Sequence, residues 1–427
     1  MKKAIMFLMI LALVSGSLFA NGQQEAKDET IVLKVMGYGD NSNQEGVSWK
    51  RIVETFEAEN PNIDIQDELL YDEAYHQKVV ARLASGDVPH VAYMGADARW
   101  GAPWKEGSQQ YDMTKDIDTA QYDLSLIPKM GPAGERYYIP LGTSNMTTVL
   151  FMNTNLVESL GFSKPETYED LVAMVPAAQA AGIDVVTIDG ADGWAWGSCF
   201  MSAMVARTTG DANWVSKAVA GEKSFTDEEF VNALSIISTM ITDGVITEKS
   251  VLVDYGTNTS NFNNEKALFM VQGQWAAGSV ENPNVKDDML LIPWPIMPGQ
   301  KAAMNDSVAA AWQVGYGITN AGSEDPAILD AAVKFINYFN NPAEVEQRLR
   351  DGAIIAPVLK NFAMPDDLPN AVIQKVALSK YAVESEVIDA FLTGDPNDAL
   401  NTGMQKIASG LATPAEVAAE VEALARK

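Results

Sequence analysis

The order of apolar and polar positions predicts strands and helices that alternate along the chain. Residues 30–36 form an apolar, β-branched run that is typical of a buried strand. Apolar residues then recur at helical spacing over 47–59, and Asn60-Pro61 ends the pattern. Strands that alternate with helices predict βαβ units and a mostly parallel sheet. The further predicted strands are 63–65, 91–94, 137–140, 147–152 and 185–188, and the further predicted helices are 75–84, 169–181, 227–243, 325–340, 370–380 and 414–425.

The first residues have the layout of a secretory signal peptide. Two lysines precede an apolar run over 4–14, and small residues up to Ala20 follow it. The run is shorter than the roughly 20 residues of a membrane-spanning helix. A lipoprotein would carry a lipid-bearing cysteine at the cleavage point, where this chain has Asn21. We therefore expect removal of residues 1–20, a polar tether over 21–29, and free diffusion of the mature protein in a periplasm.

Composition and charge narrow the possible partners and sites. The 427 residues carry a formal net charge of −27, which disfavours binding to nucleic acid or to anionic lipid. The length is sufficient for two domains. Because the chain has only two histidines, His76 and His90, a His-rich zinc site is unavailable, and we expect no metal or cofactor. The single cysteine, Cys199, stands among apolar residues and is expected to be a small buried side chain.

Several short segments follow one another in a characteristic order. The junction between the first predicted helix and the second strand reads FEAENPNI, residues 56–63. Residues 84–91 read ASGDVPHV, residues 165–171 read PETYEDL, and residues 273–275 read GQW. Together with 138–140, 152–156, 315–318, 331–336 and 410–417, these segments resemble extracellular solute-binding proteins of the sugar ABC-transporter type, the maltose-binding-like group. His90 departs from the family pattern, which has Asp at this place.

This resemblance implies the two-lobed periplasmic-binding-protein fold (Venus flytrap, type II), in which a ligand cleft separates two α/β lobes. It implies discontinuous lobes, with lobe one from 30–142 and 296–340 and lobe two from 143–295 and 341–427. The segment 290–295 is one candidate for a crossing between them. The implied function is capture of a sugar, without catalysis, and its delivery to the permease subunits of an ABC importer. We expect the protein to act as a monomer.

Aromatic side chains in turns are the first candidates for ligand binding. A sugar presents hydroxyl groups and apolar C–H faces, which planar polar side chains and aromatic rings bind. Trp194 and Trp196 lie in a Gly-rich segment, and Trp275 follows Gly273-Gln274; the family has ligand-stacking aromatic residues at the matching places. Trp312, beside a predicted strand, is a further candidate. For each, the alternative is a core or rim tryptophan, as we expect for Trp49 on the first helix.

Polar candidates follow from where ligands bind in such folds, which is beyond the carboxyl ends of the parallel strands. A capping or turn role is the alternative for the loop after the first strand, and a surface ion pair is the alternative for the loop after the third. The polar candidates are Asp40, Asn41, Asp97, Arg99, Ser144 and Asn145.

Two other functions stay open on the sequence alone. The ligand of a binding protein with this fold can be a polyol or a peptide instead of a sugar. A secreted carbohydrate-active hydrolase needs only two carboxylates, and the chain has 57 acidic residues. No phosphate-binding loop and no His-Glu-x-x-His motif supports an enzyme.

Overall fold

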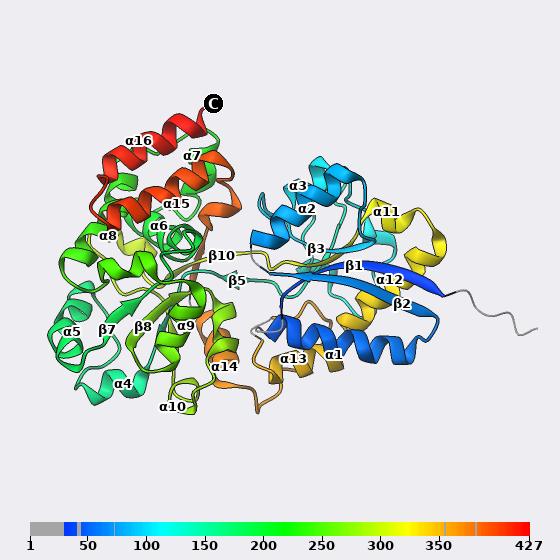
Figure 1. Cartoon of the computed structure of the whole chain (residues 1–427), viewed down its shortest axis with the longest axis horizontal. Coiled ribbons are helices and arrows are strands. Elements are labelled where there is room, and N and C mark those ends of the chain that lie inside the picture. The colour runs from blue at the N-terminus through cyan, green and yellow to red at the C-terminus, as the bar shows by residue number, and fades with distance from the viewer. Residues whose placement is uncertain (1–29, 41–43, 72, 354–355, 381) are drawn as a thin grey trace, which may run out of the picture.

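The computed structural model describes residues 30–40, 44–71, 73–353, 356–380 and 382–427. The predicted signal peptide, the tether and Asn41 lie outside the described residues. The chain forms two α/β lobes joined by a small sheet, with the N-terminal lobe at the right of Figure 1 and the other lobe at the left. This arrangement confirms the predicted α/β class and the two-lobed architecture. Within the described ranges, no helix has both the length and the apolar character that crossing a membrane requires.

The sheet of lobe one consists of β1 (Ile31–Tyr38), β2 (Ile63–Leu70), β3 (Val91–Met94), β4 (Ile139–Pro140) and β11 (Gly315–Ile318). The strand order is β2-β1-β3-β11-β4. β1 pairs in parallel with β2 and β3, as the alternation of strands and helices predicts, whereas β11 runs antiparallel to β3 and β4.

Helices cover the sheet of lobe one and fill its core with aromatic rings. Trp49 and Phe56 pack against Phe335, with ring centroids 5.5 and 5.3 Å apart, and Trp49 is a core residue as expected. The helices of this lobe are α1 (Gln44–Glu59), α2 (Glu73–Ser85), α3 (Ala102–Glu106), η1 (Met113–Lys115), η2 (Leu124–Leu126), α11 (Asn320–Ser323), α12 (Pro326–Phe339) and α13 (Pro342–Arg350).

Lobe two has a four-stranded sheet of β6 (Val149–Met152), β7 (Asp184–Thr187), β8 (Ala267–Gln272) and β9 (Leu290–Ile292), in the order β7-β8-β6-β9. Capping boxes begin α5 at Thr167 and α16 at Thr413, as the turn sequences favour. The helices of this lobe are α4 (Thr154–Ser159), α5 (Tyr168–Ala181), η3 (Trp196–Met201), α6 (Ser202–Thr209), α7 (Trp214–Val219), α8 (Glu228–Thr242), η4 (Glu248–Leu252), α9 (Tyr255–Asn263), η5 (Gln274–Ser279), α10 (Pro283–Lys286), η6 (Ala302–Met304), α14 (Asn370–Leu378), η7 (Ile388–Ala390), α15 (Asp395–Ala408) and α16 (Pro414–Ala425).

Three strands connect the lobes: β5 (Asn145–Met146), β10 (Ser307–Ala311) and β12 (Val383–Ser385), in the order β12-β10-β5. Figure 1 shows β5 and β10 running between the two lobes. The candidate crossing at 290–295 is wrong, because β9 pairs with β6 inside lobe two and Trp294 is buried in that lobe's core.

The structure also corrects the expected division of the chain between the lobes. Residues after 296 still pack on lobe two, where Met297 is buried and the backbone N–H of Lys301 donates to the Arg207 carbonyl at 2.8 Å. Residues after 341 first return to lobe one, because amphipathic α13 buries Val345 and Leu349 in its core. The second and third crossings therefore lie later in the chain than the resemblance implied, whereas the first lies next to β5, close to the expected boundary at 142.

Candidate ligand-binding site

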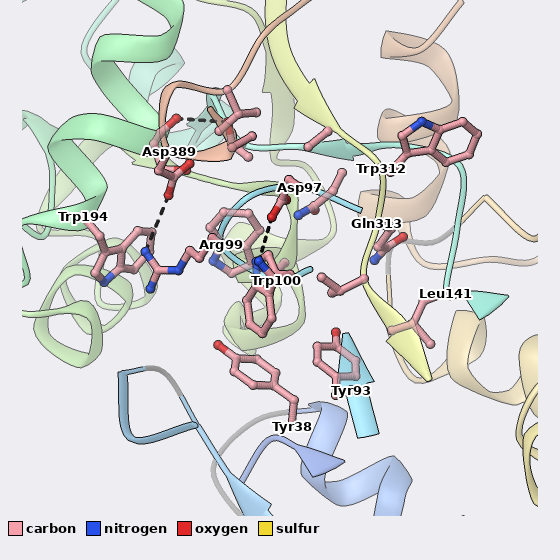
Figure 2. A pocket seen from close by; sticks show the side chains of 18 of the residues that line it. Tyr38, Tyr93, Asp97, Arg99, Trp100, Leu141, Trp194, Trp312, Gln313 and Asp389 are labelled. Carbon is pink, nitrogen blue, oxygen red and sulfur yellow. Dashed lines mark hydrogen bonds and ion pairs between the residues drawn. The ribbon is translucent and has the colours of Figure 1, made fainter. Parts of the chain in front are cut away.

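A cavity of about 160 Å³ lies between the lobes and receives side chains from both of them and from the hinge. Figure 2 shows it from close by. Lobe one contributes Tyr38, Tyr71, Tyr93, Asp97, Arg99 and Trp100; the hinge segments contribute Leu141, Asn145 and Ala311 to Val314; lobe two contributes Thr147, Trp194, Ser198, Tyr255, Trp275, Gly278, Ser279, Val387, Asp389 and Ala390.

Lobe one presents a wall of stacked aromatic rings. Parallel β1 and β3 lie side by side and place Tyr38 and Tyr93 at the cleft, where their rings stack at 5.1 Å with planes 7° apart. Trp100, in the loop after β3, meets Tyr38 edge-on at 5.2 Å. Buried Tyr75 of α2 supports these rings from behind and donates its hydroxyl to the Tyr93 carbonyl. In Figure 2 the three lining rings lie together.

Lobe two presents a second, more open aromatic wall. Trp194 lies 6.0 Å from Trp275 and 6.4 Å from Tyr255, between ring centroids. The ring of Trp275 folds back over Gly273, where any β-carbon would collide with it. Glycine at this turn therefore allows the indole to lie flat against the backbone at the cleft.

Arg99 connects the lobes through its charge. Its Nη1 lies 3.6 Å from Asp389 Oδ2 of lobe two, and its Nε donates to His76 Nε2 at 3.1 Å. Figure 2 shows the guanidinium reaching toward Asp389. Burial, and then the charge of Arg99, lower the pKa of His76 to about 3, so the imidazole is neutral and can accept this hydrogen bond.

Two carboxyl groups in the cavity are held in surroundings that disfavour their charge. Burial raises the pKa of Asp97 to about 7, although Asp97 Oδ1 accepts the backbone N–H of Trp100 at 2.8 Å. Burial also raises the pKa of Asp389, against the attraction of Arg99. With a pKa of about 7, Asp97 is able to donate or accept hydrogen bonds at near-neutral pH.

The lobes touch across the cavity. The backbone N–H of Ala98 donates to the Ala390 carbonyl at 3.1 Å, and the rings of Tyr71 and Tyr255 lie 6.5 Å apart. With the Arg99–Asp389 pair, these contacts close one side of the cleft.

The comparisons with known proteins agree with this geometry. The family model described as bacterial extracellular solute-binding protein matches residues 39–346. The chain belongs to this family. A curated relative named multiple sugar-binding protein, from Streptococcus mutans, is 24% identical over 96% of each chain. Two solved structures share the fold: a chitin oligosaccharide binding protein (TM-score 0.79, 17% identity, 93% of this chain and 98% of the other) and a sugar transporter protein of Bacillus licheniformis in complex with stachyose (0.72, 17%, 93% and 100%).

Most of the residues predicted to bind ligand in this solute-binding protein line the cavity. Trp312 lines its edge and is 40% exposed. Asp40 is not among the lining residues of the described chain, and Asn41 is outside the described residues. Ser144 is likewise not among the described lining residues, and its hydroxyl donates to Glu384 Oε1 at 2.9 Å. The predicted residues that do line the cavity are Asp97, Arg99, Asn145, Trp194, Trp275 and Trp312.

The structure corrects the prediction that Trp196 binds the ligand. Trp196 lies in the Gly-rich segment as a candidate for ligand binding, but the π-helix η3 begins at this residue. The side chain is fully buried in lobe two, and its indole N–H donates to the Gly190 carbonyl at 3.2 Å. Cys199 on the same helix is buried as expected, and burial raises the pKa of its thiol.

Sequence reasoning missed the tyrosines and the second acid of the cavity. Tyr93 belongs to the predicted strand 91–94, and Tyr38 comes two residues after the predicted strand 30–36, within the observed β1. Their position near the carboxyl ends of these strands was an available signal. Asp389 comes from a short 3-10 turn that no periodicity marks. In the described ranges, no group of three or more His, Cys, Asp or Glu side chains is arranged to hold a metal ion.

Proposed function

We propose that this solute-binding protein is the sugar-binding component of an ABC importer. It captures a sugar between its two lobes and delivers it to permease subunits in the membrane. The observation that carries the proposal is a cavity between the lobes with aromatic rings from both lobes on its walls.

The chemistry of the cavity suits a sugar better than a polyol or a peptide. Aromatic faces such as Trp275 and Tyr38 stack on the C–H faces of a pyranose ring, which an open-chain polyol lacks. Arg99, Asp97 and Asn145 offer donors and acceptors for ring hydroxyl groups. The named sugar ligands of the relatives support the same class.

Binding is coupled to lobe closure in this proposal. A ligand that contacts Trp100 of lobe one and Trp194 of lobe two interacts with both walls only when the lobes are close, and it therefore stabilises the closed arrangement. The closed form is the one that the permease recognises. The mature protein begins near Asn21, acts as a monomer in the periplasm and releases its ligand unchanged; intact mass of the exported protein tests the cleavage site.

A thermal-shift screen of the mature protein against a panel of mono- and oligosaccharides tests the proposal. A sugar at a hundredfold its dissociation constant adds about 2.7 kcal/mol to the free energy of unfolding. We expect at least one sugar to give this shift, to change the tryptophan emission, and to be recovered intact afterwards. Polyols or peptides that give the shift instead would contradict the sugar proposal, and release of reducing ends would indicate the hydrolase.

A further inference from the structure

A second cavity, of about 60 Å³, adjoins the first on the lobe-one side. Tyr38, Tyr93, Leu141, Asn145 and Gln313 are among the residues that line both. Roughly 15 Å³ accommodates one water molecule, so the space is sufficient for a small functional group of a ligand in the main cavity.

The floor of this second cavity holds a buried arginine with unused donors. Arg348 of α13 is 5% exposed, and its guanidinium stacks over the ring of Phe339 at 4.2 Å. None of its Nε, Nη1 and Nη2 atoms has a hydrogen-bond partner in the described chain. Burial lowers the pKa of Arg348 to about 10, and the group therefore stays cationic at neutral pH. Unused donors on a buried cation are costly unless a ligand satisfies them.

Another arginine of this chain is equally buried but is provided with acceptors. Arg207 is fully buried, and its Nη1 and Nη2 atoms donate to Gln300 Oε1 at 2.6 Å and to the Ser307 carbonyl at 2.9 Å. The nearby acid that favours the charge of Arg348 is Glu344, and the Arg51 guanidinium already binds its carboxylate. The fold thus supplies acceptors to one buried arginine and leaves the other open to the cavity.

The other residues that line the second cavity also favour a negatively charged group as its occupant. No acidic side chain lines the second cavity in the described part of the chain, whereas Asp97 and Asp389 line the main one. Gln313, which lines both cavities, has a buried Oε1 without a hydrogen-bond partner. A guanidinium fork binds a planar carboxylate through two parallel hydrogen bonds, and the amide oxygen accepts from a hydroxyl group.

We propose that the ligand is an acidic sugar, whose carboxylate binds Arg348 in the second cavity while its ring lies between the aromatic walls. Gln313 accepts a hydrogen bond from a hydroxyl group of the same sugar. This inference rests on the proposed sugar-binding function and narrows its substrate class to uronic acids and their oligosaccharides.

Calorimetric titration of the mature protein with matched sugars tests the inference without any variant. The probes are glucuronic and galacturonic acid and their short oligosaccharides, the corresponding methyl esters, and the neutral sugars glucose and galactose. We expect an acid to bind about tenfold to hundredfold more tightly than its ester, because esterification removes the charge that the fork recognises. An ester that binds as tightly as the acid overturns the inference.

Arg348→Met and Arg350→Met form a matched pair, since both remove one positive charge from α13. Arg350 points to solvent, where it pairs with Glu346 and Asp367. We expect Arg348→Met to lose at least tenfold in affinity for the acid and to keep or gain thermal stability without ligand, since an unpaired buried charge is removed. Arg350→Met should bind like the wild type. Arg348→Lys should fall between them, because a lysine keeps the charge but lacks the fork.

The outcomes separate this inference from the proposed function. Tight binding of neutral sugars by both the wild type and Arg348→Met contradicts the acidic ligand and leaves the sugar-binding function intact. Failure of every sugar, acidic and neutral, overturns both. If Arg348→Met does not fold, the comparison of acid with ester on the wild type decides.

Discussion

The two aromatic walls of the cleft differ in how deeply they are anchored. In lobe one, Tyr93 is 5% exposed and packs against Tyr38, Tyr75 and Tyr316, so the wall is the outer layer of the core. In lobe two, the wall stands on turns and short helix ends, with longer spacings between its rings. This difference implies that a ring of the first wall contributes to the stability of the fold, whereas a ring of the second wall contributes mainly to ligand binding.

Truncation of the first wall should have the largest effect. We expect Tyr93→Ala to lower the free energy of unfolding by about 3–5 kcal/mol, as for other buried aromatic residues, because it leaves a cavity among packed rings. Denaturant titration of the ligand-free protein measures it. Tyr255→Ala is the control in lobe two, and equal losses in the two variants would abolish the distinction between the walls.

The second wall should respond in binding instead of folding. Trp275→Ala should weaken sugar binding roughly tenfold or more, since stacking and desolvation of an indole contribute on the order of 1–3 kcal/mol. The melting temperature without ligand should fall little. Gly273→Ala sharpens the test, because the added methyl group displaces the ring of Trp275 without removing it.

Titration calorimetry measures both variants against the wild type. Similar losses of affinity in Gly273→Ala and Trp275→Ala would indicate that the position of the ring matters as much as its presence. An unfolded Trp275→Ala protein, or one with unchanged affinity, would make Trp275 a core residue and remove the main support for aromatic stacking on a sugar.

A smaller effect on stability is expected from the titration of Asp97, which accepts the backbone N–H of Trp100 in the first wall. The pKa of Asp97 is about 7 in the folded protein against 3.8 as its ordinary value, so the folded state retains a proton that the unfolded state releases. Stability therefore falls as the pH rises from about 4 to 7. Asp97→Asn keeps the acceptor for the Trp100 N–H and removes this penalty.

We expect Asp97→Asn to be more stable than the wild type by on the order of 1 kcal/mol at pH 8, since part of the carboxyl group stays hydrated at the cleft. The difference should vanish near pH 4. Melting curves recorded from about pH 4 to pH 8 measure the difference in stability between Asp97→Asn and the wild type. The neighbouring residues Arg99, His76 and Asp389 are the same in both proteins. A difference that is constant with pH would show that Asp97 is not protonated in the folded protein.

The alternation of strands and helices could be predicted because periodicity reports which side of an element is buried. Periodicity could not predict which individual aromatic rings line the cavity and which are buried in the core. Trp194 and Trp196 stand two residues apart in the same Gly-rich segment, yet one lines the cavity and the other is fully buried. The helical residues start at Trp194 and continue into the π-helix η3 at Trp196, and Gly197 inside η3 hides this helix from propensity.

The second cavity could not be predicted, because it depends on contacts between distant segments. Arg348 lies on a helix that the resemblance assigned to lobe two, while its packing against Phe339 places it in lobe one. In the sequence, Arg348 and Arg350 are two similar charges on one polar helix. Only the direction of each side chain distinguishes a buried donor from a surface ion pair.

Truncation of Trp312 should have the smallest effect on stability and on affinity. It tests whether the ligand contacts an aromatic ring outside the two walls. Trp312 is a lining residue, but it is 40% exposed, and Figure 2 shows its ring turned away from Trp194 and Arg99. No other aromatic ring packs on it in the described chain. We therefore expect Trp312→Ala to change the free energy of unfolding by less than about 0.5 kcal/mol and the affinity by less than about threefold. The same titrations measure it beside Trp275→Ala. A tenfold loss of affinity would mean that the ligand extends past the hinge to this ring, and that the cleft has a third aromatic contact from neither wall.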